Sequence, residues 1–323
     1  MNQLTWAVLF VTFMTKLWVT TQGIYVDNGN PYDNGTLEVV NLTLSQHDAP
    51  LLTKVYYPKK IDTYAVVFFA GGLLGWIPAE SYSDVLKRVA SHGFVVIGVD
   101  YLPYTFPTPP PEVRVRTHTQ EGVQSHQSKK YLEELQWLAQ HLEARIAQQL
   151  NQTGLVPDFR HLAVSCHSAG CDPIVDMAME NQTFSKAALF LEPFSYHFKT
   201  PMTYTMPAFI LGTEFSTEHP ACIFPREGYD HFYDMWQCPK IVMNVKGHGH
   251  CEVLDAWLYS VCAKYQFCKA NPDADINKYH NFIQGISAAF LTTTLQGWDK
   301  LQYITNTTLL PVQLLEFKKD LDC

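Results

Sequence analysis

Ser168 lies in a stretch whose residue order is typical of an activated serine. An apolar, strand-like run ends at Ser165, small residues surround Ser168, and apolar residues with helical spacing begin at Ile174. A serine on such a sharp strand-to-helix turn exposes its hydroxyl, and the following helix offers backbone N–H groups to an oxyanion. The usual pattern is Gly-x-Ser-x-Gly; Gly170 matches its second glycine, whereas Cys166 replaces the first. Taken alone, the stretch fits a plain strand–turn–helix connection equally well.

A serine hydroxyl is a weak nucleophile, so it needs a histidine within hydrogen-bond reach. His250 lies in a glycine-bounded loop after a buried-type strand and is our preferred base. His248, two residues earlier, is the second candidate. We expect His167, which precedes the serine, to point into the sheet and make a structural hydrogen bond.

The base in turn needs an orienting carboxylate, and two glutamates follow strand-like runs in the right part of the chain. Glu192 directly ends the strand after the elbow helix, and Pro193 fixes the turn there. Glu214 ends the next strand and stays open as the alternative acid. We expect Glu252 and Asp255 to be solvated helix residues.

Two backbone N–H groups are expected to hold the oxyanion. Ala169 follows the serine, and Gly72 lies in a glycine-rich turn after the buried-type strand 65–69. In this scheme His250 takes the Ser168 proton, passes it to the leaving alcohol, and water repeats the cycle. The alternative for the glycine-rich turn is an ordinary strand-to-helix connection.

The segments that must position these residues alternate between strand-like and helix-like, which predicts an α/β fold with a mostly parallel central sheet flanked by helices. The order serine, acid, histidine is the one that α/β-hydrolases use. Strands are expected at 36–44, 51–57, 65–69, 94–99, 162–165, 187–191, 207–212 and, as the last, 240–245, and helices at 82–90, 119–150 and 279–295. The first two strands should form an antiparallel pair. One domain, residues 24–323, should follow the N-terminal segment.

The composition limits the classes of molecule that the protein is expected to bind. A formal net charge of −8 without a basic patch argues against nucleic acid. Aromatic residues reach 13% while charged residues are only 17%, which favours a small lipophilic ligand. The segment Tyr101–Pro111, rich in proline and aromatic residues, fits either a pocket wall or a solvent-facing loop. The histidines lack ligand spacing to cysteines or carboxylates, so we expect no metal and no cofactor.

The N-terminus resembles a secretory signal peptide. Its apolar run, Leu4–Met14, is too short to span a bilayer comfortably, and small and polar residues follow it up to Gly23. We therefore expect a signal peptide over residues 1–23, a secreted protein and no stable membrane span after cleavage. A signal anchor is the alternative.

Glycosylation sequons support export. Five Asn-x-Thr sequons lie in polar, turn-like surroundings, at Asn34, Asn41, Asn151, Asn181 and Asn306.

Eight cysteines also suit an oxidising compartment, although they allow 105 pairings. The preferred local pairs are Cys222 with Cys238 and Cys262 with Cys268. Cys166 and Cys171 fit either a disulfide or two buried free thiols.

Three separated stretches resemble the chlorophyllase family, the α/β-hydrolases that cleave the phytyl ester of chlorophyll. They are Ala90–Val96, the elbow His167–Gly170, and the motifs spread over Pro220–Asp255, of which the last are the most specific. The resemblance covers roughly residues 50–260. It implies the α/β-hydrolase fold and ester hydrolysis.

Carried over position by position, the resemblance implies Ser168 as nucleophile, His250 as base and the Gly71–Gly72 turn at the oxyanion hole. Glu192 stands where the family has aspartate. Cys166 replaces the family's glycine, and Ala70 stands where the family has histidine. These departures concern the substrate more than the chemistry.

Together these observations predict a secreted serine esterase acting on lipophilic esters, with the phytyl ester of chlorophyll as one implied substrate. Two alternatives stay open. One is a catalytically silent hydrolase scaffold used for extracellular binding, and the other is a lipase, phospholipid or acyl-thioester hydrolase.

Overall fold

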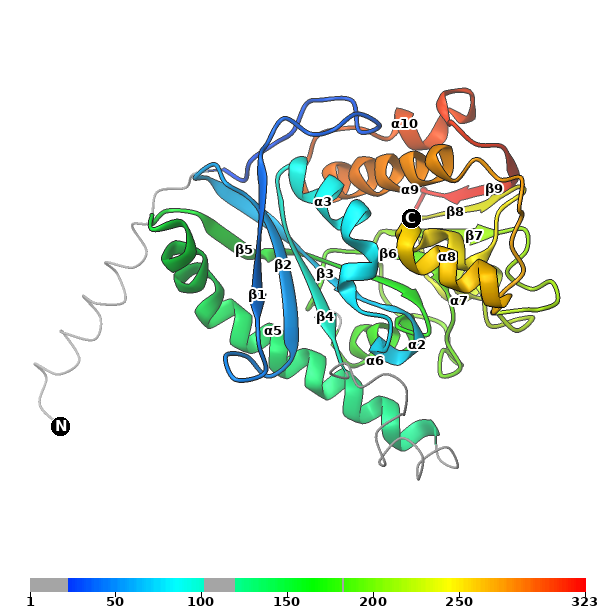
Figure 1. Cartoon of the computed structure of the whole chain (residues 1–323), viewed down its shortest axis with the longest axis horizontal. Coiled ribbons are helices and arrows are strands. Elements are labelled where there is room, and N and C mark those ends of the chain that lie inside the picture. Colours follow the sequence, from blue (N-terminus) through cyan, green and yellow to red (C-terminus); the bar gives the residue numbers. More distant parts are fainter. Residues whose placement is uncertain (1–22, 102–119, 182) are drawn as a thin grey trace, which may run out of the picture.

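A nine-stranded sheet forms the centre of the molecule (Figure 1). The computed structural model describes residues 23–101, 120–181 and 183–323. The strands lie in the order β1-β2-β4-β3-β5-β6-β7-β8-β9. They are β1 (Val39–Leu44), β2 (Leu52–Pro58), β3 (Thr63–Ala70), β4 (Phe94–Asp100), β5 (Val156–Ser168), β6 (Ala187–Pro193), β7 (Ala208–Thr213), β8 (Lys240–Val245) and β9 (Leu314–Asp320).

The pairing confirms the expected mostly parallel sheet. Strands β4, β3, β5, β6, β7 and β8 pair in parallel, and β1 and β2 form the expected antiparallel pair at one edge. The expectation that 240–245 is the last strand is wrong, because β9 pairs antiparallel with β8. This edge strand is charged and largely exposed, so it lacks the apolar run that marks interior strands.

Helices cover both faces of this sheet. They are α2 (Gly72–Gly75), η2 (Ala79–Tyr82), α3 (Ser83–Ser91), α5 (Gln120–Leu150), α6 (Cys171–Glu180), α7 (Tyr229–Met235), η3 (His250–Val253), α8 (Ala256–Tyr265), α9 (Ile276–Leu291), η4 (Thr292–Gln296), α10 (Gln302–Thr305) and η5 (Thr307–Leu309). Side chains of α5, α6 and α7 pack into one core, and those of α3 and α9 into the other. Within the described ranges, no helix has the length and apolar character needed to cross a bilayer.

The central strands supply both cores because successive side chains of a strand point to opposite faces. In β3, which is buried along its whole length, Phe68 packs into the α5 side and Phe69 into the α3 side. The sheet order, the helices on both faces and the serine at the end of β5 define an α/β-hydrolase fold. Its carboxyl-terminal strand ends position the site.

The cysteines form four disulfides, and both expected local pairs are wrong. The pairs are Cys166–Cys171, Cys222–Cys268, Cys238–Cys323 and Cys251–Cys262.

Neighbours in space explain these pairings. The Lys269 N–H donates to the Pro220 carbonyl (2.7 Å), which brings Cys222 beside Cys268. Strand β9 runs back along β8, which brings Cys323 to Cys238. Two expectations, the signal peptide over residues 1–23 and the proline-rich segment Tyr101–Pro111, lie outside the described residues except for Gly23 and Tyr101.

Candidate active site

Ser168 has the backbone geometry expected of the elbow. Its φ is +54°, in the left-handed region that residues other than glycine rarely adopt. The turn is crowded, because a Cβ atom at Gly170 would lie 2.1 Å from the Gly71 carbonyl oxygen. The Cys166–Cys171 disulfide spans this turn, so the cysteine in place of the first glycine bonds to the start of α6.

His250 is the histidine that reaches the serine. Its Nε2 lies 2.8 Å from Ser168 Oγ. His250 follows strand β8 in a tight loop. The loop is closely packed, because a Cβ atom at Gly249 would lie 2.2 Å from the Lys269 carbonyl oxygen. Both side chains are largely buried, with exposed fractions of 8% for Ser168 and 5% for His250.

Glu192 is the acid that the fold brings to this imidazole. Its Oε2 lies 3.3 Å from His250 Nδ1 and also accepts a hydrogen bond from Ser216 Oγ. The other oxygen, Oε1, has no hydrogen-bond partner among the described residues, and Glu192 borders a cavity of about 230 Å³. Glu214 instead accepts the Gly247 N–H (2.7 Å) and so holds the loop before His250.

His248 belongs to a separate buried pair. Its Nδ1 lies 2.5 Å from Glu252 Oε2, and its ring stacks on Tyr279 with centroids 4.1 Å apart. The expectation that Glu252 and Asp255 are solvated is wrong. Both are buried, because Glu252 binds His248 while Asp255 accepts the Ser83 hydroxyl (2.8 Å).

His167 makes the expected structural hydrogen bond, but it also contacts the site. Its Nδ1 lies 2.8 Å from Tyr82 Oη, and its ring stacks on His250 with centroids 4.6 Å apart. Burial first, and then the neighbouring His250, lower the pKa of His167 well below its ordinary value. The ring therefore stays neutral beside the His250 imidazole.

The Gly72 N–H is not free for an oxyanion, contrary to expectation. It donates to Tyr82 Oη (2.9 Å), a phenol oxygen of a fully buried side chain. Gly72 still lies against the serine, since an added Cβ atom would be 3.3 Å from Ser168 Cβ.

Sequence reasoning did not single out Tyr82 or Ser216 as site residues. Tyr82 has helical spacing with apolar neighbours, so it was indistinguishable from a core residue. Ser216 lies in an irregular loop two residues after Glu214, and that position was the one available signal.

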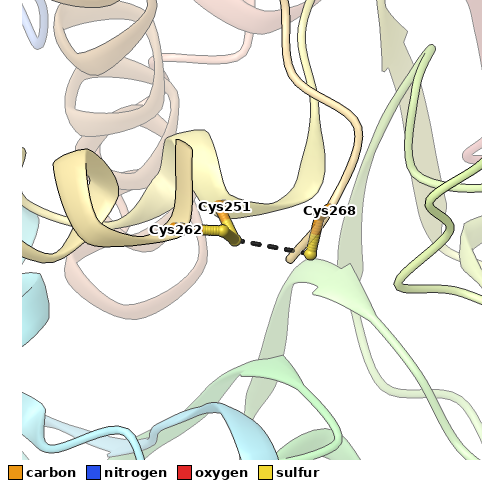
Figure 2. A group of neighbouring side chains, drawn as sticks. All are labelled: Cys251, Cys262 and Cys268. Carbon is orange, nitrogen blue, oxygen red and sulfur yellow. Dashed lines mark hydrogen bonds between the residues drawn. A yellow bond between two sulfur atoms is a disulfide. The ribbon is translucent and has the colours of Figure 1, made fainter. Parts of the chain in front are cut away.

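A cluster of three sulfurs includes that of Cys251, the residue after His250 (Figure 2). The sulfur ligand atoms of Cys251, Cys262 and Cys268 all lie within 4.8 Å of one another. All three are in disulfides, so none has a thiolate to offer to a metal ion. The cluster instead ties η3, which carries His250, to α8.

Comparison with known proteins places the chain in a family. The chlorophyllase family model matches residues 26–191 and 170–320, which together span most of the chain. The chain belongs to the chlorophyllase family.

Curated relatives of this chlorophyllase-family chain agree with the match. Chlorophyllase type 0 of Chenopodium album is 22% identical, with 89% of this chain and 86% of that protein covered. Chlorophyllase-1 of Arabidopsis thaliana is 23% identical, with 77% of each chain covered. Cutinase est2 of Thermobifida alba is 25% identical over half of this chain and 45% of its own length. The chain is thus an ester hydrolase of the α/β-hydrolase type.

Proposed function

We propose that this protein is a secreted serine carboxylic-ester hydrolase that cleaves lipophilic esters through Ser168, His250 and Glu192. One observation carries the proposal: His250 Nε2 lies 2.8 Å from Ser168 Oγ, at the carboxyl-terminal edge of an α/β-hydrolase sheet. The names of the relatives support an ester of lipophilic character, and the phytyl ester of chlorophyll is one candidate.

The proton follows the hydrogen bonds of the site. Ser168 Oγ attacks the ester carbonyl while His250 Nε2 takes its proton. Glu192 accepts the Nδ1–H of the same ring and stabilises the imidazolium that forms. His250 then protonates the leaving alcohol, and water repeats the sequence to release the acid.

The oxyanion requires donors that are not engaged elsewhere. We assign this role to the N–H of Ala169 and, in place of Gly72, to the N–H of Leu73. Leu73 follows Gly72 with a left-handed φ of +50°, and its N–H donates to no other group in the described part of the chain.

Export rests on the signal-like N-terminus, the disulfides and the sequons. All five sequon asparagines are exposed, as glycosylation requires. We propose that the mature protein is one catalytic domain over residues 24–323. Cleavage near Gly23, read by N-terminal sequencing of secreted protein, and a mass loss on enzymatic deglycosylation test this part.

Hydrolysis of a short-chain nitrophenyl ester tests the mechanism. Ser168→Ala should lower kcat by about 10³-fold or more, whereas Ser165→Ala, a buried serine of the same strand, should not. Equal rates for wild type and Ser168→Ala would remove the serine from the mechanism.

The acid is tested with a matched pair. Glu192→Gln should lower kcat far more than Glu214→Gln, since only Glu192 reaches the imidazole. The reverse order would assign the role to Glu214. A panel of chlorophyll, phospholipid and short-chain esters then separates the substrate classes.

A further inference from the structure

Helix α8 leaves an apolar face uncovered. Trp257, Val261 and Tyr265 are four residues apart and therefore form a stripe along one side of the helix, with exposed fractions of 52%, 37% and 62%. Phe267, just after the helix, is 63% exposed, and its ring centroid lies 5.9 Å from that of Tyr265. We call these four side chains the α8 patch.

This helix has little protein around it. The only buried residue of α8 is Cys262, and η3 is the one described element against which the helix packs substantially. Figure 1 shows α8, in yellow, at the periphery of the fold. The Cys251–Cys262 disulfide ties the helix to the residue next to His250, so α8 is anchored beside the proposed active site.

Other exposed apolar side chains lie on the same edge of the sheet. Leu73 and Phe224 are 60% and 63% exposed and follow the carboxyl ends of β3 and β7. Ser168 and His250 lie at the carboxyl ends of β5 and β8, which is the same edge in a parallel sheet. The apolar surface therefore belongs to the side of the molecule that carries the site.

The charges within the segment that carries the α8 patch favour a negatively charged partner. Residues 256–270 contain Lys264 and Lys269 and no acidic residue, although the whole chain has a net charge of −8. The Lys264 ammonium lies 5.5 Å from the centre of the Tyr265 ring. Residues 183–305, which include α8, also contain no glycosylation sequon.

We propose that the α8 patch docks the protein on an anionic lipid surface, from which lipophilic esters reach Ser168. Tryptophan and tyrosine favour the boundary between headgroups and hydrocarbon, and nearby lysines are attracted to anionic lipids. The identity of the delivered ester rests on the proposed function, whereas the docking itself is measured without catalysis.

Flotation of the glycosylated protein with vesicles of phosphatidylcholine, with and without phosphatidylglycerol, tests the docking. The wild type should float with the anionic vesicles. A Trp257→Ser/Tyr265→Ser/Phe267→Ser variant should lose about ten-fold or more of this binding, because its apolar anchors are gone. Lys264→Glu/Lys269→Glu should lose binding to the anionic vesicles specifically.

A control variant, Trp298→Ser/Leu309→Ser/Leu315→Ser, removes three exposed apolar side chains outside the α8 patch and should bind like wild type. Equal binding by both triple variants, or no binding by the wild type, would overturn the proposal. A wild-type dimer that becomes monomeric in the α8 variant would overturn it in favour of a second copy. The α8 variant should hydrolyse a water-soluble nitrophenyl ester at the wild-type rate. If the wild type does not hydrolyse this ester at all, the proposed function is rejected, but the docking proposal is not.

Discussion

Tyr82 Oη and His167 Nδ1 lie 2.8 Å apart, directly behind the proposed base. The phenol oxygen accepts the Gly72 N–H and also shares a hydrogen bond with His167 Nδ1. One phenol thus connects the turn after β3 to the neutral ring that stacks on His250.

Replacing Tyr82 by phenylalanine should disturb both the Gly72 turn and the His167 ring. The variant leaves the Gly72 N–H and His167 Nδ1 without partners, which costs about 1–3 kcal/mol of stability for each buried group. The displaced ring and turn should also lower kcat by on the order of 10-fold to 100-fold, because small misplacements of reacting groups are costly.

Tyr64→Phe is the control for this effect. Tyr64 is equally buried, but its hydroxyl donates to the Lys60 carbonyl (2.8 Å), away from the site. It should lose about 1 kcal/mol of stability and no activity. If Tyr82→Phe also retains full kcat in the folded protein, the connection has no part in catalysis.

Removal of each of two disulfides should affect stability and activity to different extents. The Cys166–Cys171 bridge joins residues 5 apart in sequence, and the Cys238–Cys323 bridge joins residues 85 apart. Loop-closure entropy gives about 2 kcal/mol for the short bridge and about 4.5 kcal/mol for the long one. Double alanine variants, compared by urea unfolding, should follow this order.

Activity should show the opposite order. The short bridge spans the turn that holds Ser168, so its removal should lower kcat, whereas the Cys238–Cys323 variant should hydrolyse esters at the wild-type rate. A kcat that falls only in the Cys238–Cys323 variant would contradict the assignment of the short bridge to the elbow.

Glu134 should make stability depend on pH. This carboxyl is buried and accepts the Leu51 N–H (2.9 Å) and the Thr53 hydroxyl (2.8 Å). Burial raises the pKa of Glu134 to about 7. The folded state therefore binds the Glu134 proton more tightly than the unfolded state does. The stabilisation that this proton gives to the folded state is fully present below about pH 4.5 and is lost as the pH rises to about 7.

The loss attributed to Glu134 amounts to roughly 3 kcal/mol, at about 1.4 kcal/mol per pKa unit. Glu134→Gln carries no charge, so it should gain stability relative to wild type between about pH 5 and pH 8. Urea unfolding at both pH values measures this gain. A difference between the two proteins that does not change with pH would show that Glu134 titrates normally.

The sequence predicted the interior strands well because each is a continuous apolar run. Strand β9 was not predicted, since an exposed edge strand needs no continuous apolar run. The Ser168 turn could be located because a serine between small residues, after a strand and before a helix, is a local pattern. The choice between Glu192 and Glu214 and the cysteine pairs depended on contacts between distant segments, which spacing along the chain does not encode.

The buried polar side chains illustrate the same limit. Glu252 and Asp255 resemble solvated helix residues in the sequence, and only their partners, His248 and Ser83, explain their burial. The spacing of Tyr82 in the sequence is that of an apolar core residue. In the structure, however, its hydroxyl makes hydrogen bonds to groups from two other elements.

Covalent labelling with a fluorophosphonate, followed by peptide mass spectrometry, tests the central claim most directly. The wild type should carry one phosphonyl adduct on Ser168, and His250→Ala should be labelled on the order of 10³-fold more slowly, because the serine loses its base. Folded protein that hydrolyses esters but carries the adduct elsewhere, or none at all, would contradict the Ser168–His250 mechanism.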